Sequence, residues 1–88
     1  MDNVTRQQLA TIFLNYFKFL DKGPVGAWMI HVDFVDLEEI SEWAMEAVIY
    51  CYMKGVITGK PGNAFDPQGQ ATRAEFATML MRFADAVE

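Results

Sequence analysis

The chain has little of several residue types, and each shortage excludes a class of protein. Its 88 residues include one cysteine, Cys51, which excludes an internal disulfide and a cysteine-ligated zinc site. Only 7 lysines and arginines stand against 12 aspartates and glutamates, so the net charge is −5. An acidic chain without a basic block is a poor candidate for binding nucleic acid or an anionic membrane, and we expect neither partner.

Long apolar runs and catalytic patterns are missing as well. No apolar run reaches the ~18 residues of a membrane span, and the first residues, Met1 to Arg6, do not resemble a signal peptide. The lone His31 has no cysteine near it, and the acidic residues between Asp33 and Glu39 lack the spacing of a calcium loop. We find no triad or carboxylate-pair pattern, and we predict no enzyme, no cofactor and no metal site.

Apolar residues, by contrast, are abundant. They make up 52% of the chain, and aromatic residues make up 14%. This composition excludes a disordered tail. A chain of this size buries only ~60–65% of the surface that its unfolded form exposes. The composition therefore raises the question of where so much apolar surface is placed.

An internal repeat links the two ends of the chain. Residues 3–14 align with residues 70–81 at an offset of 67 residues, with Thr, Arg, Ala and Thr identical. Thr72 and Glu75 form a capping box, in which the hydroxyl and the carboxylate satisfy free backbone N–H groups at a helix start. Thr5 and Gln8 are its uncharged counterpart. The two predicted helices are Arg6–Leu20 and Arg73–Val87.

Both predicted helices carry an apolar face with the helical period. In the first helix this face comprises Leu9, Ala10, Phe13, Tyr16, Phe17 and Leu20, with Ile12, Leu14 and Phe19 lying off it. In the second helix the face comprises Phe76, Ala77, Leu80, Phe83, Ala84 and Val87, opposite Glu75, Thr78, Arg82 and Asp85.

A third helix is predicted from Glu42 to Lys54. Ser41 is a suitable N-cap, although Asp36 offers an earlier start, and Gly55 suits the position that follows a helix end. This helix is apolar almost all round, which is typical of a buried helix. The sequence thus predicts an all-α fold of three main helices.

The remaining segments are connectors. A turn at 21–24 ends the first helix, residues 27–34 could be extended, and a long loop rich in glycine and proline follows Gly55. Phe65 is the large apolar residue of this loop, and residues 66–69 have the composition of a tight turn.

Five short motifs occur in a fixed order along the chain. They are Phe34-Val35-Asp36, Trp43-Ala44, Gly55-Val56-Ile57-Thr58-Gly59, Phe65-Asp66-Pro67 and Thr72-Arg73-Ala74-Glu75. In this order and spacing the sequence resembles an S-layer homology module. The resemblance implies that 34–88 is a complete module, that 1–20 is the closing helix of a preceding module, and that 21–33 is a linker. It also implies a piece of a larger surface protein, with Met1 added for expression.

The resemblance also implies an architecture and a function. Such modules usually occur three in a row as a pseudo-threefold prism of helices. They attach exported bacterial proteins non-covalently to a secondary cell-wall polysaccharide, often one that carries pyruvate ketals. The implied location is the bacterial cell surface, and the implied partners are this polysaccharide and sister modules. Carried over by position, the binding residues are Arg73, Gly59, Gly62, Asp36, Trp43 and, as a partial second copy, Arg6.

The implied chemistry is reasonable for arginine. A pyruvate ketal presents a carboxylate, and a guanidinium group can bind it with two parallel hydrogen bonds. Arg73 and Arg6 each stand at a predicted helix start, where the helix dipole adds partial positive charge.

Each implied binding residue also has a structural interpretation. Arg73 could pair with a nearby carboxylate, Trp43 fits a core position, and Asp36 fits a helix or turn cap. Gly59 and Gly62 fit positions that need unusual backbone angles. Cys51, on an apolar helix face, fits a small buried side chain.

Two functions therefore stand side by side. The first is a carbohydrate-binding anchor, and the second is an assembly module that packs against sister modules without binding sugar. The loop sequence Pro61-Gly62-Asn63, where the family often has Gly-Asp-Gly, favours the second; the intact Thr72–Glu75 motif favours the first. We also expect an exposed apolar patch and a dimer or higher assembly, with chains exchanging the first helix.

Overall fold

The computed structural model describes residues 4–26 and 32–88. It contains α1 (Arg6–Phe19), two 3₁₀ turns η1 (Leu37–Glu39) and η2 (Glu42–Ala44), α2 (Met45–Met53) and α3 (Arg73–Ala86). Two isolated β-bridges, Thr5 with Gln70 and Lys60 with Ala64, are the β-pairing within the described ranges, and no sheet forms there. The predicted all-α fold is confirmed.

Local capping chemistry fixes where α1 and α3 begin. Both capping boxes are complete: Thr5 accepts from the Gln8 N–H and Gln8 caps the Thr5 N–H, while Thr72 and Glu75 do the same. Each helix begins at its predicted residue and ends one residue earlier than predicted, because Leu20 and Val87 are the C-caps.

The middle helix is shorter than predicted. Its first turn, η2, is 3₁₀, and the Ser41 hydroxyl forms no cap because it accepts a hydrogen bond from the Gln7 amide at 2.9 Å. Oε1 of the Gln7 side chain in turn accepts from the Ser41 N–H at 2.9 Å. Gly55 follows the helix end with φ of 77°, as the sequence predicts.

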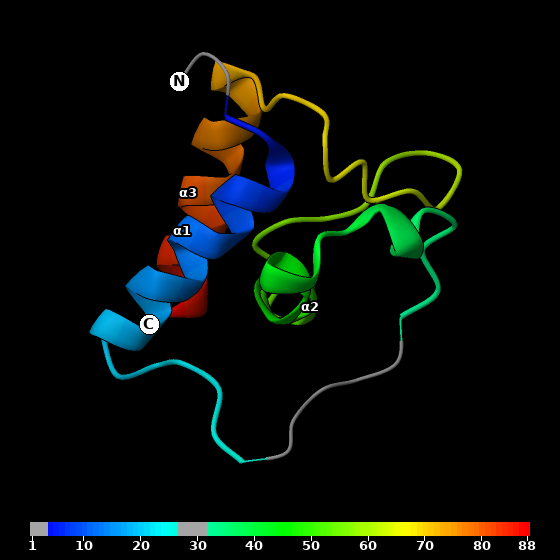
Figure 1. Cartoon of the computed structure of the whole chain (residues 1–88). Coiled ribbons are helices and arrows are strands. Elements are labelled where there is room, and N and C mark those ends of the chain that lie inside the picture. The colour runs from blue at the N-terminus through cyan, green and yellow to red at the C-terminus, as the bar shows by residue number, and fades with distance from the viewer. Residues whose placement is uncertain (1–3, 27–31) are drawn as a thin grey trace.

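The two copies of the repeat lie side by side and run in the same direction, and α2 lies against α1 (Figure 1). Aromatic rings fill the seam between α1 and α3. The Phe17 and Phe83 ring centroids are 4.8 Å apart, and those of Phe13 and Phe83 are 5.4 Å apart. Such ring pairs contribute roughly 0.5–1.5 kcal/mol each beyond their buried area.

The long loop folds back onto this helical core. Phe65 is fully buried, and its ring packs against Phe34 at 5.4 Å between centroids. Asp36 holds the backbone there, since its two carboxylate oxygens accept from the Phe65 and Asp66 N–H groups at 2.9 and 2.7 Å. The predicted turn at 66–69 is present, closed by the Gly69 N–H to the Asp66 carbonyl.

Several predicted burial patterns are wrong. Leu14 is buried rather than off the core face, while Tyr16 and Leu20 are exposed. On α3, Met79 is buried, while the expected Leu80 is about half exposed. The large apolar side chains left exposed on these two helices and at the C-cap of α1 are Ile12, Tyr16, Phe19, Leu20, Leu80 and Met81.

The segment 27–34 is only partly described. The possible extension over 27–31 lies outside the described residues, and residues 32–34 form no strand. Val32 and Phe34 are nevertheless buried in the core.

Candidate functional site

Arg6 joins the start of α1 to the loop that follows Gly55. Its side chain is only 3% exposed. Its guanidinium donates to the Phe65 carbonyl at 2.8 Å, to the Thr58 carbonyl at 2.7 Å and to the Glu75 carboxylate at 3.2 Å. The Phe65 ring lies 5.1 Å from Cζ of Arg6, within cation–π range. Arg6 is therefore the centre of a buried polar network.

Burial and the neighbouring carboxylates act on this network in opposite directions. Burial lowers the pKa of the Arg6 guanidinium, while Glu75, Asp66 and Asp36 oppose that effect. The pKa of Glu75 lies below its ordinary value, chiefly because the Thr72 N–H donates to its carboxylate, with Arg6 adding attraction against the cost of burial. Arginine keeps its charge in proteins, so the pair is ionised at neutral pH.

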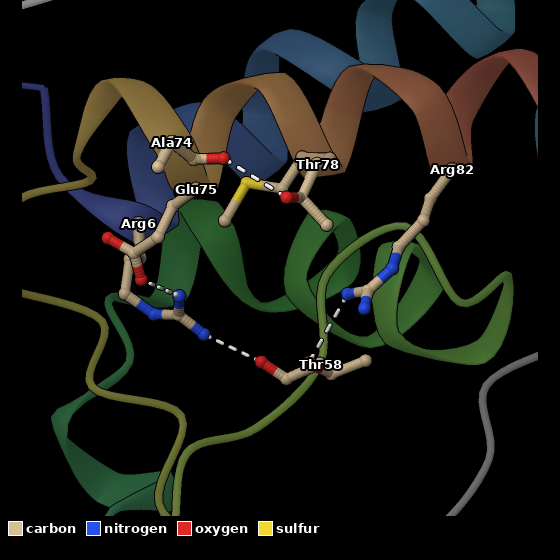
Figure 2. Close-up of a pocket in the computed structure, with 7 residues that line it drawn as sticks. Arg6, Thr58, Ala74, Glu75, Thr78 and Arg82 are labelled. Atoms are coloured by element: carbon tan, nitrogen blue, oxygen red, sulfur yellow. Dashed lines mark hydrogen bonds and ion pairs between the residues drawn. The ribbon is translucent and has the colours of Figure 1, made fainter.

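An open pocket of about 240 Å³ lies beside this network (Figure 2). We call it the Arg82 pocket. Arg6 enters from the start of α1, Thr58 lies across from it on the loop, and Glu75, Thr78 and Arg82 come from α3. The complete lining is Arg6, Thr58, Ala74, Glu75, Thr78, Met79 and Arg82.

Arg82 is the exposed cation of this pocket. Its Nη1 lies 3.5 Å from the Thr58 hydroxyl, a distance at the limit of a hydrogen bond. The remaining N–H donors of its planar fork have no partner among residues 4–26 and 32–88. The Thr58 hydroxyl lies beside Arg82, while the Thr78 hydroxyl donates to the Ala74 carbonyl at 3.1 Å and can still accept a hydrogen bond. Together these groups can hold a small carboxylate with neighbouring hydroxyls.

The sequence-based site did not include Thr58, Thr78 or Arg82. Thr78 and Arg82 lie, together with Glu75, on the polar face predicted for the helix Arg73–Val87, so the sequence indicates their shared orientation. It does not indicate their approach to Thr58, on a loop that lies 20 and 24 residues earlier.

The two loop glycines, Gly59 and Gly62, stand where a larger side chain would strain or crowd the backbone. Gly62 has φ of 85°, which favours glycine. A Cβ at Gly59 would lie 3.1 Å from the Phe34 ring and 3.3 Å from the Ala64 carbonyl. Both therefore allow the tight loop whose carbonyls receive Arg6.

Trp43 lies apart from this network. The core interpretation is wrong, because its side chain is 62% exposed. The short 3₁₀ turn directs it away from α2 towards the outer side of α1. There it lines a shallow groove of about 390 Å³ with Val4, Gln8, Thr11 and Ile12.

Arg73 is placed differently from its repeat partner. It is exposed at the start of α3, and it has no hydrogen-bond or ion-pair partner in the described part of the chain. The structure therefore gathers Arg6, Asp36 and Gly59 around the loop, and it leaves Trp43 and Arg73 at other positions.

Cys51 is buried against α1. Its thiol donates to the Ala10 carbonyl at 3.4 Å, and burial raises the pKa of the thiol to about 12. Within the described ranges no three His, Cys, Asp or Glu side chains gather as a metal site would require. None of the helices described there has the length and apolar character to cross a membrane.

Comparison with known proteins places the chain in a family. The family model for the S-layer homology domain matches residues 33–77. The chain is 34% identical over 82 residues to a cellulosome-anchoring protein of Acetivibrio thermocellus, covering 93% of this chain and 18% of that protein. It is 33% identical over 82 residues to an amylopullulanase of Thermoanaerobacterium thermosulfurigenes, covering 90% of this chain and 4% of that enzyme.

A third relative is cell surface glycoprotein 1 of A. thermocellus, 29% identical over 86 residues, with 98% of this chain and 4% of that protein covered. The chain thus spans a small part of the curated relatives that it matches. No solved structure matches it significantly. Since the family model covers more than half of the chain, the protein belongs to the S-layer homology domain family.

Proposed function

We propose that the module anchors a protein to the bacterial cell surface by binding an acidic wall polysaccharide in the Arg82 pocket. Relatives named as a cellulosome-anchoring protein and a cell surface glycoprotein support the cellular role. The observation that carries the binding role is the exposed fork of Arg82 beside the Thr58 hydroxyl, in a pocket that Thr78 also lines.

The proposed ligand group is a carboxylate of the pyruvate-ketal type. Arg82 would bind its two oxygens, and the threonine hydroxyls would bind neighbouring sugar hydroxyls. Arg6 contributes positive charge to the pocket while its own donors hold the loop carbonyls. Because Glu75 offsets one of the two guanidinium charges, the pocket keeps a net charge near +1, which suits a single carboxylate.

The other residues implied by the family have supporting roles in this proposal. Asp36, Gly59 and Gly62 shape the loop that presents Thr58. Trp43 offers an exposed aromatic surface in the groove along α1, where a sugar ring can stack. Arg73 stands at the equivalent of the Arg6 position, without a loop beside it, and so forms half of a second site.

A pull-down on purified cell-wall sacculi tests this function with the full chain. Loss of one charge-assisted interaction of about 1.5 kcal/mol should lower the affinity of Arg82→Ala roughly tenfold. Lys22→Ala is the matched control, because it removes one exposed positive charge far from the pocket. Extraction of the secondary polymer, or removal of its pyruvate by mild acid, should abolish retention of the parent chain. Equal retention of Arg82→Ala and the parent would contradict the proposal.

A second candidate is an assembly module that binds no sugar. The exposed apolar side chains on α1 and α3 favour it, since Phe19 is 86% exposed and Met81 is 71% exposed. In this case the isolated chain self-associates, and wall retention is unchanged when the polymer is extracted. Sedimentation at tens of micromolar tests the association, and a monomer there would contradict it.

A further inference from the structure

Glu75 carries a charge that its helix cap does not require. In the other copy of the repeat, Gln8 stands at the matching position, and its uncharged amide oxygen accepts from the Thr5 N–H at 2.8 Å. The Glu75 carboxylate accepts from the Thr72 N–H at 2.8 Å as well. Both capping boxes are complete. The cap alone therefore does not account for the negative charge at Glu75.

The nearest partner of this charge is Arg6. Nη1 of Arg6 lies 3.2 Å from Oε2 of Glu75. The other donors of Arg6 hold the Phe65 and Thr58 carbonyls, and its side chain is only 3% exposed. A ligand in the Arg82 pocket cannot take these donors without opening the loop. Arg6 therefore acts on such a ligand through its charge.

Glu75 also faces the Arg82 pocket. Its side chain is 30% exposed, and it lies beside Arg6, with Arg82 further along α3 (Figure 2). Among the described residues, Arg6, Glu75 and Arg82 are the charged side chains that line the pocket. The ionised carboxylate balances one guanidinium charge and leaves one unbalanced. Without it, both guanidinium charges would act on a ligand.

We propose that Glu75 selects the charge of the ligand, so that the pocket accepts a group with one negative charge and disfavours a group with two. This inference rests on the proposed function and adds a selectivity that anchoring alone does not require. The favoured group is a carboxylate. The disfavoured group is a phosphate monoester, which carries about −1.5 to −2 charges at pH 7. Its second charge would meet the Glu75 carboxylate, and a like-charge contact of this kind suppresses a wrong partner.

The donors of the pocket do not make this distinction by their shape. A guanidinium fork binds the oxygens of a carboxylate or of a phosphate with two parallel hydrogen bonds. The Thr58 hydroxyl beside Arg82 can donate to either group. Discrimination between two such ligands needs a repulsive element as well as an attractive one. Glu75 is the acidic residue of the pocket lining, so it is the residue that can supply the repulsion.

Two probes of similar size test the selectivity. One is a methyl hexoside that carries a single pyruvate ketal, and the other is the same hexoside with a single phosphate monoester. Each is titrated into the isotope-labelled chain at pH 7 and low salt, and the NMR signals of the Thr58 amide and the Arg82 Nε–H report binding. The pyruvate ketal should bind about fivefold more tightly, as expected for one partly exposed pair of like charges. Added salt should narrow this ratio, because it screens the repulsion.

Two variants raise the charge of the pocket by different routes. Glu75→Gln removes the carboxylate, and Gln8 shows that glutamine can complete the cap. Ala74→Lys adds a positive charge at an exposed lining residue while Glu75 stays in place, so it also serves if Glu75→Gln does not fold. Each should bring the two affinities to within about twofold or reverse the preference. Glu46→Gln is the matched control: it removes an acidic charge outside the pocket lining, and it should keep the preference of the parent.

The outcomes separate this inference from the proposed function. If the parent binds the pyruvate ketal and both variants keep its preference, the role of Glu75 is overturned while the anchoring proposal stands. Equal or tighter binding of the phosphate by the parent would have the same meaning. Binding of neither probe at Arg82 would contradict the proposed function, and this inference with it.

Discussion

Helices α1 and α3 share a sequence repeat and a capping box, yet their surroundings differ. The start of α1 is enclosed, with Arg6 bound to two loop carbonyls and a carboxylate. The start of α3 faces solvent at Arg73. The comparison teaches that the repeat encodes the helix and its cap, while the neighbouring segments decide whether the start of the helix is buried.

The largest difference in unfolding free energy between matching substitutions on α1 and α3 is expected in the aromatic seam. Phe13 is fully buried, whereas its counterpart Leu80 is 47% exposed. Phe13→Ala should lower the free energy of unfolding by about 3–5 kcal/mol, and Leu80→Ala by less than about 1 kcal/mol. Urea denaturation followed by circular dichroism measures both.

Phe13→Leu serves as the milder variant in case Phe13→Ala does not fold. It places the α3 residue at the α1 position, and we expect an intermediate loss. Equal losses at the two positions of the repeat would show that α3 is not open in solution.

The next largest difference in unfolding free energy is expected between substitutions of Arg6 and Arg73. Arg6→Ala leaves two carbonyls and Glu75 without their buried partner, so we expect a loss of about 3 kcal/mol in unfolding free energy. Arg73→Ala should change it by less than about 0.5 kcal/mol. Both variants remove one positive charge at a helix start, so each is the control for the other in thermal denaturation at matched pH.

The stability of the chain at low pH should reveal the contribution of the Glu75 carboxylate. The pKa of Glu75 is below its ordinary value of 4.5, so the unfolded chain binds the proton more tightly than the folded chain does. The stabilisation that the ionised Glu75 gives the folded state is therefore complete above its ordinary pKa. It is lost as the pH falls through the lower pKa of the folded state. Glu75→Gln should cost about 1.5 kcal/mol at pH 7 and flatten the acid limb of the stability curve. An unchanged acid limb would contradict this role.

The smallest effects are expected at the caps, where the two helices are alike. Thr5→Ala and Thr72→Ala should each cost about 1 kcal/mol, because each removes one hydroxyl acceptor at a helix start. Similar losses from the two variants, measured by urea denaturation, would confine the difference between α1 and α3 to tertiary contacts. A loss at Thr5 several times that at Thr72 would place the difference in the caps as well.

The sequence predicted best what local chemistry decides. The capping boxes located both helix starts, Gly55 located the end of α2, and the module pattern indicated the family and an all-α fold. These features depend on residues a few positions apart, so one sequence suffices to find them.

Features that depend on tertiary contacts were missed. Trp43 looked like a core residue because its turn was expected to continue α2, and the 3₁₀ geometry turns it outward instead. The Arg82 pocket was missed because Thr58 approaches α3 only after the loop folds around Phe65. The burial of Arg6 depended on the same loop, whose path no local pattern specifies.

A crystal structure of the 88-residue chain tests the contrast between the two helix starts most directly. Nε of Arg6 should lie about 2.8 Å from the Phe65 carbonyl and Nη2 about 2.7 Å from the Thr58 carbonyl, while Arg73 stays in solvent. A structure in which the Arg6 guanidinium points into solvent, or in which Arg73 is enclosed within its own chain, would contradict the account.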